Sequence, residues 1–209
     1  MKRLLASLIS FLGLGPFETP KDFPDKLAPL DLSAMRIPEV TGEMTVDQFW
    51  DIIAAAIEVS KGDLEVEEAG LHKAISALSP ENVLTYRHHW DECDAQAYNW
   101  DLWAAAYIIQ GGCSDDSFQD FRASLICQGR DRFEQVLKNP ECLADAEFDG
   151  IAERLYYEGF QYVPATVYKE KTGEDMQGSS VARPADPTGD EWEEDDLPEK
   201  FPKLWKKFD

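Results

Sequence analysis

The chain has 209 residues, enough for one domain of ordinary size with a full hydrophobic core. Its 41 acidic and 20 basic residues give a net charge of -21, which repels phosphate backbones and anionic lipids and so argues against nucleic-acid binding. Residues 45–168 alone carry 23 acidic and 8 basic side chains, so most of this charge lies in the part expected to fold. Two interpretations stay open: solubility through self-repulsion, or a surface suited to a cationic partner.

The cysteine pattern indicates free thiols. The four cysteines are scattered along the chain and none belongs to a C-x-x-C pair, which argues against a disulfide-stapled scaffold. They are Cys93, Cys113, Cys127 and Cys142. A reducing compartment is the simplest account, so we expect a cytoplasmic protein.

The first 14 residues admit three interpretations. Lys2 and Arg3 precede an apolar run over residues 4–14, which is the charge order of a secretory signal, but no A-x-A-like cleavage site follows. The leucines of this run also have helical spacing, which predicts a short amphipathic helix that docks on its own domain or on a partner. The run is too short to span a bilayer. A docking helix, a signal or membrane-surface anchor, and an irregular segment therefore remain open, and export would follow if residues 1–15 act as a signal.

The connection that follows differs sharply from the segment after it. Residues 15–44 contain five prolines, which predicts an extended segment. At Thr45 the stretch "TVDQFWDIIAAAIEVS" begins with a threonine and has Gln48 three residues later, as in a capping box, ahead of one apolar face. We therefore expect a helix to begin here.

Three more helices follow in the first half of the chain. Residues 64–78 repeat the amphipathic pattern with an acidic first turn. Ser79 and Pro80 predict the N-cap and first position of the next helix. The stretch "NWDLWAAAYIIQGG" predicts another, stopped by Gly111 in a left-handed conformation.

The second half is expected to be helical as well, since no convincing strand pattern appears. Its apolar positions have helical spacing; they are Phe118, Phe121, Leu125, Ile126, Phe133, Val136, Leu137, Phe148, Ile151, Leu155 and Tyr156. A last helix is expected from Pro164 to Gly173, and residues 177–209 form an acidic arm whose aromatic anchors should fasten it to the domain. We predict an all-α single domain of about six to eight helices over residues 45–176, with arms packed on it.

Several of these segments together resemble a known bacterial family. They are "MTVDQFWDIIAAA", "WDLWAAAYIIQGGCSDDSFQDFRASLICQGRDRFEQVL", "NPECLA" and "AERLYYEGFQYVPATVYKEKTGEDM". Over roughly residues 44–176 they are similar to the domain of unknown function 4240. The resemblance implies a small helical bacterial domain and brings no activity, cofactor or catalytic residue with it.

The most distinctive stretch, "GGCSDDSFQDFR", has a structural and a functional interpretation. Structurally, Gly111 ends one helix, Ser114 caps the next, and Asp115 and Asp116 face the positive end of its dipole, while Arg122 pairs with Asp101 or an acid on a neighbouring helix. Functionally, the two aspartates together with Asp120 would bind a divalent cation or form an acid–base pair. The structural interpretation is favoured, because adjacent helical residues point about 100° apart.

Other candidate chemistry is sparse. His89 and Cys93 are four residues apart and could supply two zinc ligands, with His72 or Cys113 as further ligands. Cys113 at a helix start would have a lowered pKa if it were exposed, although burial is the default. No nucleophile elbow, phosphate-binding loop or dinucleotide fingerprint occurs, so no cofactor is expected.

Trp100 and Trp103 could line a binding site or anchor an interface, although the alanines that follow favour a core layer.

With no convergent catalytic set, the leading hypothesis is a non-enzymatic acidic module that binds a basic protein, in its most concrete form an immunity- or antitoxin-like inhibitor of a basic toxin or nuclease. The alternatives are an enzyme or metal-dependent binding domain near Asp115, Asp116 and Arg122, and a peripheral membrane regulator acting through residues 1–14.

Overall fold

The computed structural model describes residues 30–145, 154–179, 181–182 and 184–208. The chain divides into two compact units, Met1–Leu30 and Asp31–Asp209, and the description below concerns the second. The predictions for residues 1–29 and for Phe148 and Ile151 lie outside the described residues.

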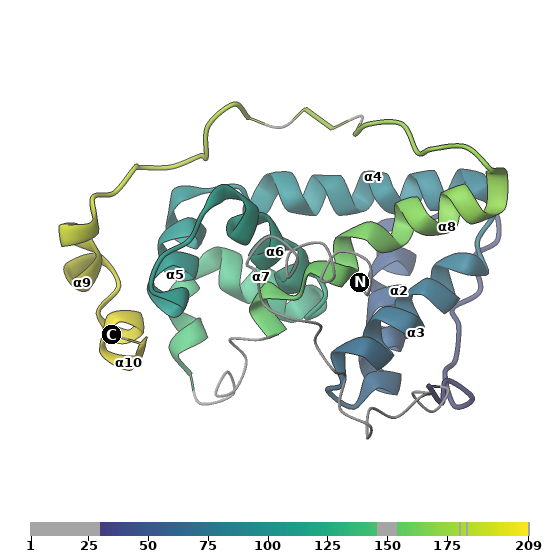
Figure 1. Cartoon of the computed structure of the whole chain (residues 1–209), viewed down its shortest axis with the longest axis horizontal. Helices are drawn as coiled ribbons and strands as arrows, with labels where there is room; N and C mark the ends of the chain where they lie inside the picture. The colour runs from purple at the N-terminus through teal and green to yellow at the C-terminus, as the bar shows by residue number, and fades with distance from the viewer. Residues whose placement is uncertain (1–29, 146–153, 180, 183, 209) are drawn as a thin grey trace, which may run out of the picture. The chain divides into compact units, whose positions relative to one another are not determined.

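The fold of this unit is all-α. Its described residues contain nine α-helices, four short 3₁₀ helices and no β-strand (Figure 1). The α-helices are α2 (Val46–Ser60), α3 (Leu64–Ser76), α4 (Pro80–Ala97), α5 (Trp100–Gln110), α6 (Asp115–Ile126), α7 (Arg130–Lys138), α8 (Val163–Thr172), α9 (Leu197–Lys200) and α10 (Pro202–Phe208). The 3₁₀ helices are η1 (Pro140–Ala144), η3 (Arg154–Tyr156), η4 (Glu158–Tyr162) and η5 (Glu194–Asp196). Seven α-helices precede the arm, within the predicted six to eight, and the arm adds two.

Local capping chemistry sets the helix ends, as the sequence predicted. The Thr45 hydroxyl accepts from the Gln48 amide while the Gln48 side chain accepts from the Thr45 amide, which completes a capping box on α2. Ser79 caps α4 ahead of a proline in its first turn. Gly111 and Gly173 end α5 and α8 with φ of 70° and 77°, a conformation in which a side chain would be strained.

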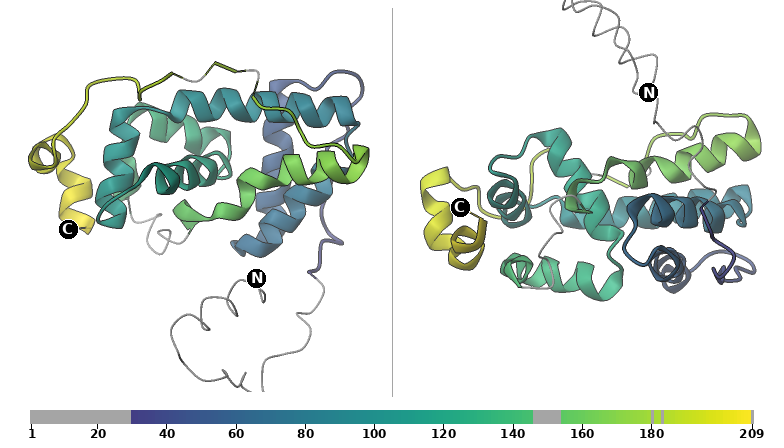
Figure 2. Two further views of the ribbon diagram at one scale, coloured as in Figure 1. Left: turned by 45° about the horizontal axis from the view of Figure 1, so that its top comes forward. Right: turned by 60° about the horizontal axis from the view of Figure 1, so that its bottom comes forward.

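Two layers of helices bury the core. α2 and α3 pack against each other as an antiparallel pair, and α8 runs beside both α3 and α4 (Figures 1 and 2). Phe49 of α2, Tyr86 of α4 and Phe121 of α6 are among the largest completely buried side chains of the core. Residues ahead of α2 are tied in by hydrogen bonds: the Asn82 amide donates to the Gly42 carbonyl at 2.8 Å, and Lys73 Nζ donates to the Leu32 carbonyl at 2.8 Å.

The C-terminal arm packs on the domain, which confirms the prediction. It joins α5 through an isolated parallel bridge between Asn99 and Thr188, in which the Thr188 carbonyl accepts the Trp100 amide at 2.9 Å. Leu197, Phe201 and Leu204 are then buried as α10 contacts α5 and η1. No helix in the described part of the chain combines the length and the apolar character needed to cross a membrane.

Candidate functional site

The distinctive corner between α5 and α6 is built by helix-end chemistry. Ser114 caps α6 by accepting the Ser117 amide at 3.2 Å, and Asp115 and Asp116 occupy its first two positions with exposed side chains. Their carboxylates therefore face the positive end of the helix dipole, as expected. This explains the aspartate pair without invoking a ligand.

Arg122 lies apart from those aspartates, inside the core. Only 2% of it is exposed, and its Nε donates to Asp94 Oδ1 on α4 at 2.8 Å. Its guanidinium carbon is also 4.6 Å from the centre of the Phe118 ring and 4.9 Å from that of Tyr98. Of the two partners anticipated, it therefore pairs with the acid on a neighbouring helix, whereas Asp101 pairs with Lys200 of the arm at 2.9 Å.

Asp120 completes the predicted set and has its own partner. Its Oδ1 accepts from Gln161 Nε2 of η4 at 2.7 Å. Burial, aided by the nearby charge of Glu158, raises the pKa of its carboxyl. The aspartates of α6 and Arg122 thus serve separate caps and pairs, and no cluster of three or more His, Cys, Asp or Glu able to hold a metal ion occurs among the described residues.

The weaker zinc candidates are also held separately. His89 Nδ1 lies 3.1 Å from Glu92 Oε2, and the imidazole packs beside Phe49. Cys93 is buried, and burial raises the pKa of its thiol to about 12, which disfavours the thiolate that zinc requires. His72 pairs instead with Glu170 of α8 at 3.0 Å.

Cys113 is half-buried although it stands next to the start of α6. Burial raises the pKa of its thiol to about 12, outweighing the opposing effect of Arg122. The lowered pKa expected of an exposed thiol therefore does not arise here.

Trp100 and Trp103 form part of an aromatic stack. Their rings are 5.5 Å apart and nearly parallel, and Trp103 stacks in turn on Phe118 at 4.8 Å. The Trp103 indole donates to the Cys113 carbonyl at 3.0 Å, while the Trp192 indole of the arm donates to the Trp100 carbonyl at 2.9 Å. Trp103 therefore packs on the core, and Trp100 anchors an interface within the chain.

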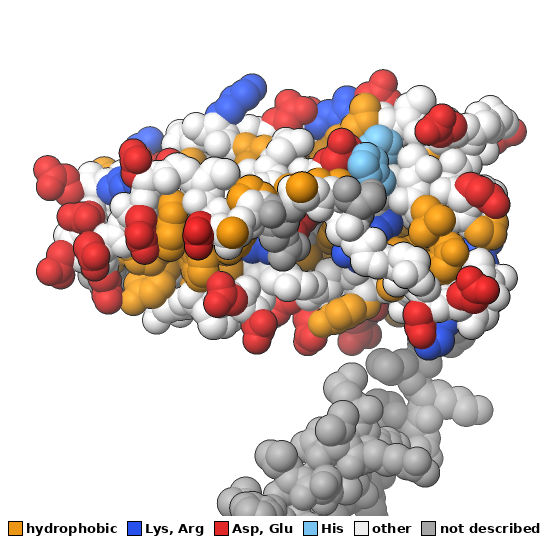
Figure 3. Space-filling model, turned by 90° about the horizontal axis from the view of Figure 1, so that it is seen from above, with side chains coloured by type: hydrophobic (Ala, Val, Ile, Leu, Met, Phe, Trp, Pro, Cys, Tyr) orange, Lys and Arg blue, Asp and Glu red, His pale blue; other side chains and the backbone are white. Residues whose placement is uncertain are grey.

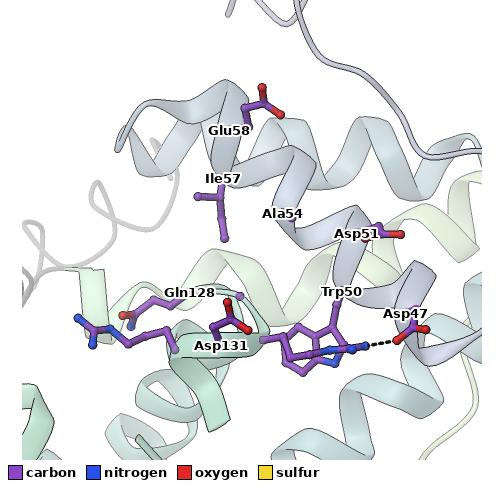
Figure 4. A pocket seen from close by; sticks show the side chains of 11 residues that line it. Asp47, Trp50, Asp51, Ala54, Ile57, Glu58, Gln128 and Asp131 are labelled. Atoms are coloured by element: carbon purple, nitrogen blue, oxygen red, sulfur yellow. Dashed lines mark hydrogen bonds and ion pairs between the residues drawn. The ribbon is translucent and has the colours of Figure 1, made fainter. Parts of the chain in front are cut away.

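A broad concavity lies elsewhere, between α2 and the start of α7. It has a volume of about 710 Å³. The residues that line it come from α2 and from the chain at the start of α7 (Figure 4): Asp47, Trp50, Asp51, Ala54, Ile57 and Glu58 on one side, and Gln128, Gly129, Arg130, Asp131 and Arg132 on the other. We call this feature the α2–α7 groove. The α2 residues recur at helical spacing, so a single face of the helix forms one wall.

The α2–α7 groove combines an apolar floor with an acidic rim. Ala54 and Ile57 provide apolar surface above Trp50, which is only 8% exposed, and the side chains of Asp51 and Glu58 are exposed (Figure 4). Arg130 is already engaged, because its Nη2 lies 2.7 Å from Asp47 Oδ1 and its guanidinium lies over the Trp50 ring. Acidic side chains also predominate over basic ones on the face seen in Figure 3.

Residues 44–170 match the family described as "Protein of unknown function (DUF4240)". The chain belongs to the DUF4240 family. No curated protein and no solved structure matches it. The DUF4240 region extends from the last residue before the α2 cap into α8, so it contains both the α5–α6 corner and the α2–α7 groove, whereas the arm lies beyond it.

The α2–α7 groove of this DUF4240 domain was not predicted from the sequence, although one of its walls could have been. Asp51, Ala54 and Glu58 stand at i, i+3 and i+7 beside the apolar positions of α2, which marks the solvent-facing side of the helix. The opposite wall depends on Gly129, whose φ of 86° turns the chain into α7 with no side-chain cap. A Cβ added at Gly129 would lie 3.5 Å from Ile57 Cδ1, so the two walls approach to van der Waals distance at this point. Gly129 and Ile57 are far apart in the sequence, so this approach depends on tertiary packing and could not be read from local spacing.

Proposed function

We propose that this DUF4240 domain binds a basic protein partner through the α2–α7 groove. The observation that carries the proposal is the pairing of apolar surface with an acidic rim in this groove. In its most specific form the protein is an immunity- or antitoxin-like inhibitor of a basic toxin or nuclease.

The groove's chemistry suits a segment that presents both apolar and basic side chains. Ala54 and Ile57 offer apolar surface to a partner, and Trp50 lies buried beneath the Arg130 guanidinium as part of the floor. Asp51 and Glu58 form no hydrogen bond or ion pair with any described residue, so they can pair with arginine or lysine without breaking an existing contact. The excess of acid over residues 45–168 would speed association with a cationic partner at low salt.

Charge reversal tests the proposal. Products of genes adjacent to the one encoding this chain are co-expressed with it and captured, and the dissociation constant is then measured by calorimetry at increasing salt. The groove variant is Asp51→Lys/Glu58→Lys. The matched control, Glu174→Lys/Glu191→Lys, changes the net charge by the same amount at exposed positions outside the groove.

We expect a salt-sensitive complex that the groove variant weakens at least tenfold and the control weakens far less. Equal weakening by both variants would mean that the partner senses only the overall charge, and the groove assignment would then be wrong. Absence of any salt-sensitive partner would reject the inhibitor form of the proposal.

The peripheral membrane alternative rests on residues 1–14, which lie outside the described residues. It remains a prediction. Flotation with anionic liposomes, comparing the full chain with a variant lacking residues 1–14, tests it directly.

A further inference from the structure

A second, smaller cavity lies between α4, α6 and η4 and takes no part in the α2–α7 groove. Its volume is about 220 Å³. One face of α4 supplies Arg87, Trp90, Asp91 and Asp94, and the remaining lining residues are Gln119, Ala123, Gln161 and Tyr162. Except for Trp90, Ala123 and the Tyr162 ring, these side chains are polar, so the cavity can form several hydrogen bonds. We call it the α4–α6 pocket.

Asp91 leaves one hydrogen-bonding position open in this pocket. Asp91 is 7% exposed, and its Oδ1 accepts from Arg87 Nε at 2.6 Å. Its buried Oδ2 accepts no hydrogen bond from any described residue. Buried carboxylate oxygens nearly always have a donor, so this atom is a specific point for a ligand N–H to meet.

The charges around the pocket favour a cation. Asp94 forms an ion pair with Arg122, and Asp91 forms one with Arg87, so each of these two guanidinium groups already has a carboxylate partner. Two further carboxylates border the pocket residues: Asp120 accepts from Gln161, and Glu158 accepts from the Tyr162 hydroxyl at 2.9 Å. Among the residues that the structure describes, these four carboxylates outnumber the guanidinium groups of Arg87 and Arg122.

Arg87 is the lining residue that lies directly against the Asp91 carboxylate. Its side chain is 32% exposed, so the outer atoms of this long side chain can rotate into solvent. The deeper walls are fixed, because Trp90 and Ala123 are buried in the core. The pocket is smaller than the 300–1,000 Å³ typical of drug-sized ligands, so it suits a single small functional group.

We propose that the α4–α6 pocket binds an organic cation, a guanidinium or primary ammonium group, that donates N–H to Asp91 Oδ2. The cation is either a free small molecule or the side chain of an arginine or lysine presented by another protein. This site is independent of the α2–α7 groove and of the function proposed for it.

Isosteric ligand pairs test the charge requirement. Methylguanidinium and its neutral analogue methylurea are titrated into the full chain while the NMR signals of Trp90 and Ala123 are followed. The blocked tripeptides Gly-Arg-Gly and Gly-citrulline-Gly form the second arm. We expect saturable shifts, with millimolar affinity, for a cation and not for its neutral partner. Binding of methylguanidinium itself assigns a free small molecule, whereas binding confined to Gly-Arg-Gly assigns a protein side chain.

Two variants with opposite expected effects locate the binding. Asp91→Asn keeps the shape of the side chain and removes the charge, so the cation should bind at least tenfold more weakly. Arg87→Gln removes the competing guanidinium, so the cation should bind severalfold more tightly even if Asp91→Asn fails to fold. Asp195→Asn, at an exposed position that lines neither the α2–α7 groove nor the α4–α6 pocket, is the matched control and should leave affinity unchanged. The proposal is overturned if neither cation produces saturable shifts, if the neutral ligands bind as well, or if Arg87→Gln leaves affinity unchanged.

Discussion

Replacing Arg122 with methionine should destabilise the domain strongly. The substitution retains a long side chain among the rings of Tyr98 and Phe118 but removes the buried guanidinium that pairs with the Asp94 carboxylate. Removing one partner of a buried pair costs about 3–5 kcal/mol. Domains are stable by roughly 5–15 kcal/mol, so the loss removes a large share of the total, and the variant stays folded at 25 °C if the wild-type stability exceeds about 7 kcal/mol.

Urea unfolding followed by tryptophan fluorescence measures the effect. With a slope of about 2 kcal/mol per molar, the midpoint should fall by about 2 M. The double variant Arg122→Met/Asp94→Leu removes both charges and should recover most of the loss, since an apolar pair often replaces a buried ion pair at little cost. Arg122→Lys should be intermediate, because it keeps the charge but not the planar contact with the rings. A loss below 1 kcal/mol in Arg122→Met, or no recovery in the double variant, would refute this account of the core.

Three further outcomes are expected. Because burial raises the pKa of Cys113 to about 12, its thiol should react with a disulfide reagent at pH 8 at least tenfold more slowly in the native than in the urea-unfolded chain; equal rates would show an exposed thiol. Trp192→Ala, which deletes the bond to the Trp100 carbonyl, should lower stability by about 1–2 kcal/mol in urea unfolding, and an unchanged midpoint would mean that the arm is not held there. Glu67 of α3 is buried and pairs with Arg154 at 2.9 Å, and its burial outweighs this pairing and raises the pKa of its carboxyl. Between the unfolded and the folded pKa the native state holds a proton that the unfolded chain has released, so stability should fall as pH rises through this window. Glu67→Gln should lose this slope when urea midpoints are compared from pH 4 to 7.

The helix ends could be predicted because their chemistry is local. The box formed by Thr45 and Gln48, the cap at Ser79 and the left-handed stop at Gly111 each depend on residues within one turn of one another. The aspartates at the start of α6 belong to the same class, since the dipole that they face is that of their own helix. Sequence spacing is sufficient information for such features.

The pairings between helices could not be predicted in the same way. Arg122 had several acids within plausible reach, and its choice of Asp94 depends on how α4 and α6 pack. The thiol of Cys113 illustrates the same limit, because its pKa follows burial and not its position beside a helix start. Both cavities are likewise formed by helices whose contact is visible only once the core is assembled.

The way the arm completes α5 has a consequence for how the protein is made. The carbonyl of Trp100 receives its indole donor from Trp192, 92 residues further along the chain, and the Trp100 amide bonds to Thr188. During translation, α5 therefore leaves the ribosome long before the segment that covers it. A nascent chain that has reached only the end of the DUF4240 region exposes the surface later buried by Leu197, Phe201 and Leu204. Chaperone binding to stalled nascent chains should accordingly persist until the arm has emerged.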